Sequence, residues 1–395
     1  MDSIKPCRPA DIRDLRAHIK PDRPIHNNNM TVPIPITVLT GFLGSGKTTV
    51  LRHLGSLGVL QRTLILVNEF GEVGLDHELL TPIDDDTLVA VESGCICCTI
   101  RADLVQTLSE APWRYARDGQ RWFDRVIIET TGIADPAPIL QTILGDEKVS
   151  NQYALAAVLT AVDAVNGAQT LKHHFEAVKQ VAVADRILLT KADLFDGSNE
   201  TLMRSIRTLA PSAPINPIVD GEASADWFFS NNIYSAEGKT SDVEAWLMGE
   251  SQQASADVED HNHNHDHDHD HDHDHDHDHD HEHEHKHDLN RHGTIAASCL
   301  TFEQPVDAAL FETCLAMLME FRGEDLLRVK GIINVAGMDR PMVIHGVQHV
   351  FHPPQVLDEW PSADRRSKIV IIARELEIDA IRSCFASVGL EALGN

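Results

Sequence analysis

The fold of this chain is decided by the stretch Ile34-Pro-Ile-Thr-Val-Leu-Thr-Gly41-Phe-Leu-Gly-Ser-Gly-Lys47-Thr48-Thr49. Its first half is β-branched and apolar, which is typical of a buried strand. After the glycines, apolar residues recur with helical spacing at Val50, Leu51, Leu54 and Leu57. The stretch therefore predicts a strand, a glycine-rich turn and a helix, the context that a phosphate-binding loop of the form GxxxxGK(S/T) requires.

Each residue type in this loop suits a nucleotide. Glycines allow successive backbone N–H groups to point at the β-phosphate, and the helix N-terminus adds its positive pole. Lys47 is expected to reach the β- and γ-phosphate oxygens, and the Thr48 hydroxyl to ligate Mg²⁺, so both are also predicted to act in catalysis. The predicted nucleotide-binding residues of the loop are Gly41, Gly44, Ser45, Gly46, Lys47, Thr48 and Thr49.

A P-loop protein also needs an acid at the end of a neighbouring strand, to hold the Mg²⁺ shell. The apolar run Arg125-Val-Ile-Ile-Glu129 leads into Glu129-Thr-Thr-Gly132. We therefore predict Glu129 as a catalytic residue on the magnesium side. The N–H group of Gly132 is expected to turn to the γ-phosphate as a switch.

The base is predicted from Leu188-Leu-Thr190-Lys191-Ala192-Asp193. A carboxylate just beyond a strand accepts both N–H groups of the guanine edge, whereas adenine offers no such donor pair. Asp193 therefore favours GTP, and the stem of Lys191 is expected to cover the ring. The usual motif opens with asparagine, so Thr190 predicts a changed hydrogen bond to the base.

Three thiols lie together in Gly94-Cys95-Ile96-Cys97-Cys98-Thr99. Three sulfurs within four residues suit one soft or borderline cation such as Zn²⁺, Co²⁺ or Cu⁺. The fourth ligand must come from elsewhere, and such an incomplete shell suits transfer of a metal better than permanent structure. A buried or redox-active cluster without metal is the alternative.

The segment Asn68-Glu-Phe-Gly-Glu72-Val-Gly-Leu-Asp76 lies between the P-loop and the thiols. Two glycines and three acids after a strand indicate an oxygen-rich switch segment that senses both sites. Glu72 and Asp76 are candidate ligands for Mg²⁺ or for the cargo metal. An ordinary solvated loop is the alternative.

The formal charge of the 395-residue chain is −28, and much of it is local. Fourteen histidines occupy every odd position from His261 to His287, and residues 257–288 carry a net charge of −13, which leaves −15 elsewhere. Such a tract cannot bury apolar surface, so we expect it to be disordered and to collect metal ions weakly, or to serve only as an acidic spacer. An acidic body repels a polyphosphate backbone, which argues against nucleic acid as a partner.

Repeated strand and helix patterns predict an α/β fold. The apolar runs do not alternate with polar residues, which indicates a mostly parallel sheet covered on both faces. We predict a flexible N-terminal extension at residues 1–33, a P-loop domain at 34–220, a linker with the histidine tract at 221–293 and a smaller α+β domain at 294–395. No apolar stretch is long enough for a membrane helix and no signal peptide is apparent, so a cytoplasmic protein without membrane contact is expected.

Several long motifs resemble one known family. In order they are TGFLGSGKTT, NEFGEVGLDH, GCICCT, ETTGIADPAP and ADRILLTKAD, and LLRVKGIINVAG, HGVQHVF and DRRSKIVIIARELE follow in the last hundred residues. They look like the CobW/YjiA-type metal-associated P-loop GTPases, relatives of the nickel-insertion GTPases. The resemblance implies metal ligation by Cys95, Cys97 and Cys98, a magnesium-side Glu129 and guanine recognition by Lys191 and Asp193.

These observations predict a GTP-hydrolysing metallochaperone with GTP, Mg²⁺ and Zn²⁺ or Co²⁺ as its ligands. We expect low intrinsic turnover, because no arginine finger is identifiable. The expected partner is a metal-requiring client protein, and the chain is expected to be a monomer or a weak homo-oligomer. The alternatives are a metal-storage protein with nucleotide-regulated binding and a P-loop kinase that acts on a small molecule.

Overall fold

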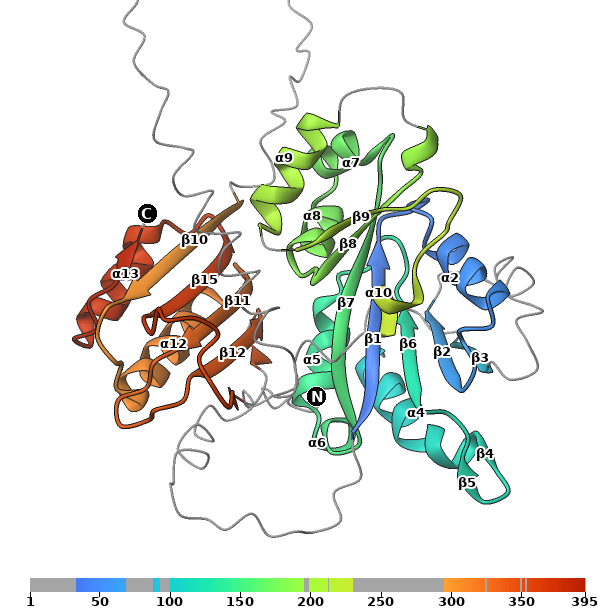
Figure 1. The fold of residues 1–395 in the computed structure, drawn as a ribbon, viewed down its shortest axis with the longest axis horizontal. Coiled ribbons are helices and arrows are strands. Elements are labelled where there is room, and N and C mark those ends of the chain that lie inside the picture. The colour runs from blue at the N-terminus through green and yellow to red at the C-terminus, as the bar shows by residue number, and fades with distance from the viewer. Residues whose placement is uncertain are drawn as a thin grey trace, which may run out of the picture.

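The computed structural model describes residues 33–68, 88–92, 100–194, 199–211, 213–229, 295–323, 325–348, 350–351 and 354–394. These residues form two domains that lie side by side, each built on a seven-stranded sheet (Figure 1). Residues 1–32 of the predicted N-terminal extension and the whole histidine tract lie outside the described residues.

The first sheet is parallel throughout, with the strand order β3-β2-β6-β1-β7-β8-β9. The strand before the P-loop is central, because β1 pairs with β6 on one side and with β7 on the other. The bounds of the strands are β1 Ile34–Gly41, β2 Thr63–Asn68, β3 Leu88–Glu92, β6 Arg125–Glu129, β7 Tyr153–Asp163, β8 Arg186–Thr190 and β9 Ile215–Pro217.

Helices cover both faces of this sheet, which confirms the predicted fold class. Successive residues of β6 point to opposite faces: Val126 and Ile128 belong to one apolar cluster and Ile127 to another. The first cluster includes side chains of α4 (Ile100–Arg114), α5 (Ala137–Gly145) and α6 (Glu147–Ser150). The second includes side chains of α2 (Lys47–Ser56) and α10 (Ala225–Phe229).

A third cluster surrounds β8 and includes side chains of α7 (Gly167–His173), α8 (Phe175–Ala182) and α9 (Glu200–Leu209). A short hairpin, β4 (Ala116–Arg117) and β5 (Gln120–Arg121), extends beyond α4. Helix α10 follows residue 220, the predicted end of the P-loop domain, and buries Phe228 in the second cluster.

The second sheet is antiparallel, with the order β13-β12-β11-β15-β10-β16 and β14 paired to β12. Its strands are β10 Ile295–Phe302, β11 Leu326–Ile333, β12 Met342–Val347, β13 Val350–Phe351, β14 Gln355–Val356, β15 Ser367–Arg374 and β16 Leu393–Gly394. Helices α12 (Ala308–Arg322) and α13 (Ile378–Ser387) pack on one face of the sheet.

The other face of the second sheet meets the first domain. Along β15, Ile369 and Ile371 pack against the helices, whereas Val370 and Ile372 pack against Ala182 at the end of α8. Figure 1 shows α8 on the side of the first domain that is turned to the second sheet. Side chains on one face of β15 thus pack in the core of the second domain, and those on the other face pack in the contact between the domains.

A buried ion pair fixes this contact between the domains. The Arg328 guanidinium of β11 contacts the Asp185 carboxylate, and it also donates to the carbonyl oxygen of Ala184 at 2.6 Å. Lys330 is the second cation, with its Nζ 3.2 Å from Asp185 Oδ1. Asp185 Oδ2 in turn accepts the N–H group of Val158 in β7 at 2.8 Å. The second domain is therefore tied to the central sheet of the first.

No helix among the described residues is both long enough and apolar enough to cross a membrane.

Arg328→Met should lower the free energy of unfolding by about 3 kcal/mol, because it leaves the buried Asp185 carboxylate short of a partner. Urea denaturation measures this. Arg340→Met is the matched control, because Arg340 pairs with Asp358 at the surface, and its loss should cost less than about 1 kcal/mol. Equal effects of the two substitutions would contradict a stabilising role for the buried pair.

Candidate functional site

Backbone geometry shapes the P-loop, which connects β1 to α2. Gly41, Gly44 and Gly46 have φ values of 141°, 70° and 86°, in the region that favours glycine. Gly41 also needs the space, because a Cβ atom there would lie 2.4 Å from the carbonyl oxygen of Ala161 in β7. The loop therefore has its shape because β1 and β7 are paired.

Polar side chains meet inside the loop. Lys47 is 8% exposed, and its Nζ donates to the carbonyl oxygens of Gly41 at 2.8 Å and Phe42 at 3.3 Å. Thr48 Oγ1 donates to Glu129 Oε1 at 3.1 Å, and Glu129 is buried at the end of β6. The structure thus brings together the three residues that were predicted to act in catalysis.

The hydroxyl of Thr48 and the carboxylate of Glu129 are hard oxygen donors, which are the ligands that Mg²⁺ prefers. The two residues therefore fit the predicted magnesium ion.

A tight turn after β6 packs on the P-loop. The N–H group of Ala134 donates to the carbonyl oxygen of Thr131 at 3.1 Å, which places Gly132 and Ile133 at the centre of the turn. A Cβ atom on Gly132 would lie 2.6 Å from both the N and the Cα of Leu43. Only glycine allows this approach, and the predicted switch residue therefore touches the phosphate loop.

Thr190 is buried at the end of β8, where its hydroxyl is 2.7 Å from the carbonyl oxygen of Ser45 and 3.1 Å from that of Val162. Because a hydroxyl has one hydrogen to donate and both neighbours are acceptors, it is committed to the backbone. Thr190 therefore holds the P-loop to β7 and β8. The threonine that replaces the usual asparagine thus bonds to the backbone of the P-loop and of β7.

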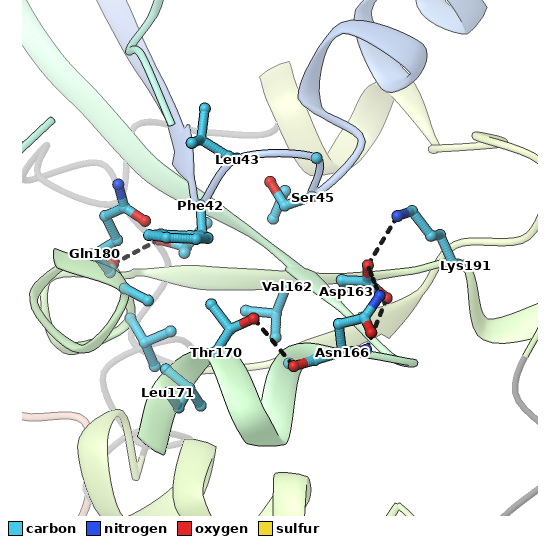
Figure 2. A pocket seen from close by; sticks show the side chains of 16 residues that line it. Phe42, Leu43, Ser45, Val162, Asp163, Asn166, Thr170, Leu171, Gln180 and Lys191 are labelled. Carbon is cyan, nitrogen blue, oxygen red and sulfur yellow. Dashed lines mark hydrogen bonds and ion pairs between the residues drawn. The ribbon is translucent and has the colours of Figure 1, made fainter. Parts of the chain in front are cut away.

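Lys191 has a φ of 56°, and its Nζ lies 2.7 Å from Asp163 Oδ2. Figure 2 shows Asp163 between Lys191 and Asn166, and the Asn166 amide also donates to Asp163 Oδ2, at 3.1 Å. Burial raises the pKa of Asp163, but the hydrogen bonds from Lys191, Asn166 and the backbone outweigh it. Its pKa is therefore below the ordinary value and the carboxylate is charged.

Asp163 was not predicted from the sequence. Its signal was an acid at the end of a long apolar strand, as at Glu129. Asp193, in contrast, is exposed, and its Oδ1 lies 3.4 Å from the backbone N of Asp220. The loop at Asp220 and Gly221 packs over α2, because a Cβ on Gly221 would lie 2.9 Å from Thr49 Cγ2.

One cavity of about 370 Å³ joins most of these groups. Its walls come from the P-loop, from the end of β6, from the Gly132 turn and from Lys191. All of them lie at the carboxyl ends of parallel strands, the edge at which open α/β sheets bind ligands. The arrangement suits a nucleotide whose phosphates lie in the loop.

The predicted metal ligands Glu72, Asp76, Cys95, Cys97 and Cys98 lie outside the described residues. Their flanking elements are described: β2 ends at Asn68, β3 ends at Glu92 and α4 begins at Ile100. Within the described part of the chain, no group of three histidine, cysteine or acidic residues could hold a metal ion.

Two family models match the chain in order. Residues 35–217 match the nucleotide-binding domain of the CobW/HypB/UreG family. Residues 295–388 match the C-terminal domain of the cobalamin synthesis protein CobW.

Several relatives bear names that concern zinc. The zinc chaperone YjiA of Escherichia coli is 29% identical over 357 residues, which are 90% of this chain and 99% of that protein. The zinc chaperone CobW of Pseudomonas aeruginosa is 31% identical over 53% of this chain and 62% of its own length. A crystal structure of Zn(II)-bound YjiA GTPase from E. coli has a TM-score of 0.59 at 25% identity, and the match covers 91% of this chain and 99% of that one.

Asp163→Asn should lower the affinities for GTP and for GDP by a similar factor of about ten, because Lys191 loses a charged partner beside the base site. Titration with fluorescent nucleotides measures both affinities. Asp226→Asn changes an exposed acid and serves as the control. A loss confined to GTP would contradict a role on the base side.

Gly132→Ala should reduce the rate of GTP hydrolysis on the order of 100-fold, because the new methyl group must displace either the turn or Leu43. Phosphate release at saturating GTP measures it. Gly145→Ala, in the helix that follows, is the control: the new Cβ would meet only Val350 Cγ1, at 3.8 Å. A Gly132→Ala protein as active as this control would disprove the close packing.

Proposed function

Because the chain belongs to the CobW family of P-loop GTPases, we propose that it is a zinc chaperone, which hydrolyses GTP to deliver the metal to a client protein. The cargo is zinc in this proposal, and cobalt is the alternative that the same ligands would accept. The observation that carries the proposal is the packing of the Gly132 turn against Leu43, because it places the predicted switch residue against the phosphate loop.

We propose a separate role in GTP binding or hydrolysis for each residue of the site. Lys47 is proposed to exchange its loop carbonyl partners for phosphate oxygens, and the N–H group of Gly132 to turn to the γ-phosphate. Thr48 and Glu129 would hold Mg²⁺, which when bound neutralises charge on the phosphate oxygens. Asp163 fixes Lys191 beside the base, and Asp193 is proposed to read the guanine edge.

The described elements that flank the thiol segment support coupling to the nucleotide. The chain leaves β3 at Glu92 and enters α4 at Ile100, so the connection that contains Cys95, Cys97 and Cys98 starts from the carboxyl end of a parallel strand. The Glu72 and Asp76 segment starts from the same edge, after β2. Strand β3 lies two places from β6 in the sheet, which is roughly 10 Å from Glu129.

This arrangement supports a two-state cycle. GTP would hold the segment after β2 so that its carboxylates and the three thiolates face one Zn²⁺. Loss of the γ-phosphate would free that segment and lower the affinity for the metal. Thermodynamic linkage then requires that zinc also raise the affinity for GTP by the same factor. The histidine tract is proposed to collect metal for this site.

Zinc affinity should be at least ten-fold higher with a non-hydrolysable GTP analogue than with GDP, because the two sites share a switch segment. Competition against a chelating dye measures both. Cys97→Ala should abolish the tight, nucleotide-dependent site, whereas Cys299→Ala, in β10 of the second domain, should retain it.

Two outcomes would count against the chaperone. Equal zinc affinities with the two nucleotides would remove the coupling. If deletion of residues 261–287 removed most of the zinc capacity and Cys97→Ala had no effect, the chain would be a metal store.

A further inference from the structure

Gln180 is a fully buried glutamine in α8, with 0% of its surface exposed. Its Nε2 donates to the carbonyl oxygens of Gly132 at 3.2 Å and Ala134 at 3.0 Å. Because only the NH₂ end of an amide donates to two carbonyl groups, these contacts fix the orientation of the side chain. Gln180 therefore holds both sides of the turn at Gly132 from within the protein.

The turn is clamped between two surfaces. The P-loop residue Leu43 lies against Gly132, and Gln180 binds the carbonyl oxygens of the turn. Figure 2 shows Gln180 beside Phe42 on the wall of a second cavity, of about 260 Å³, which also includes Leu43. A shift of α8 would therefore change the place of the turn relative to the phosphate loop.

Packing alone does not account for a glutamine here. Gln180 Oε1 is buried and has no hydrogen-bond partner among the described residues. A buried amide that lacks part of its bonding costs stability, whereas an apolar side chain of similar size costs none. The surrounding residues Ala177 and Val181 are apolar, and a leucine or methionine would suit them. What the glutamine adds is the pair of donated hydrogen bonds.

A second contact ties the same helix to the segment that follows the turn. Lys179 Nζ lies 2.6 Å from Asp135 Oδ2, and Asp135 Oδ1 accepts the N–H group of Ala137 at the start of α5. Lys179 and Gln180 are neighbours in α8, and Gly132 to Asp135 are neighbours in the switch. The helix and the switch are thus joined by adjacent contacts.

We propose that Gln180 is a positioning residue for GTP hydrolysis, which holds the Gly132 turn, and that the second domain sets its position through Arg328. Arg328 donates to the carbonyl oxygens of Val183 and Ala184, the first residues after α8. Ala182 packs on Leu327, Val370 and Ile372 of the second sheet. The second domain therefore holds the end of α8, and Gln180 lies in the last turn of that helix.

The link acts on the rate of hydrolysis. Movement of the second domain shifts the end of α8, and with it the turn that Gln180 holds. The proposal rests on the role proposed for Gly132 at the γ-phosphate, but not on zinc or on a client.

Gln180→Met tests the positioning role, because methionine fills the same space without donating. We expect kcat to fall at least ten-fold, with the KM for GTP and the affinity for GDP changed less than three-fold. Hydrogen exchange of the Ala134 amide should become faster, and the melting temperature should not fall. Gln180→Leu provides a second variant with the same expectation.

The matched control is Thr160→Val. Thr160 Oγ1 donates to the backbone carbonyl oxygen of Gln180 at 2.8 Å, so this variant loses a buried hydrogen bond to the same residue without touching the turn. Its kcat should stay within two-fold of the wild type. If Gln180→Met kept its kcat within two-fold, or lost kcat only in proportion to its melting temperature, the positioning role would be refuted.

Arg328→Lys tests the link between the domains. It keeps a positive charge beside Asp185 but loses the planar fork that reaches Val183 and Ala184. We expect faster exchange at Ala134 and a kcat at least three-fold lower, whereas Arg340→Lys should leave both unchanged. Normal exchange and normal kcat in Arg328→Lys would overturn the link. Because every measurement is made without zinc, failure here is distinct from failure of the metal coupling.

Discussion

Parallel pairing of seven strands is the constraint on which the rest of the structure depends. It brings the carboxyl ends of β1, β6, β7 and β8 to one edge, although these strands come from distant parts of the sequence. Gly41, Glu129, Asp163 and Thr190 each end one of these strands. The chemistry of the site is therefore a property of the sheet rather than of any single loop.

Close backbone contacts turn this edge into a connected unit. Gly41 lies against Ala161, Gly132 against Leu43, and the Thr190 hydroxyl against the carbonyl oxygen of Ser45. Each contact joins a different strand to the P-loop, so the loop is supported from both neighbours of β1. The net charge of the chain has no part in this, because a P-loop binds phosphate through local N–H groups and one lysine. An acidic protein can therefore bind a polyphosphate.

The sequence was informative where a function depends on one contiguous motif. The P-loop, Glu129 and the parallel sheet were predictable because residue type and spacing carry their geometry. Strand β9 was not predicted, since a run of three residues gives little periodicity, and β3 was not predicted either. Asp163 and Gln180 were missed for another reason: each acts through a residue 28 or 48 positions away. Gln180 looks like any polar residue of an amphipathic helix until the fold places Gly132 beside it.

The central position of β1 in the sheet has a consequence for how the protein folds during its synthesis. Its partners β6 and β7 begin 91 and 119 residues later in the chain, so the strand that carries the P-loop waits unpaired while they are synthesised. Such distant pairing makes folding slow, because a long loop must close before the contact stabilises it. During translation the domain can therefore bind a nucleotide only late, because β1 is made first and both of its partner strands are made long after it.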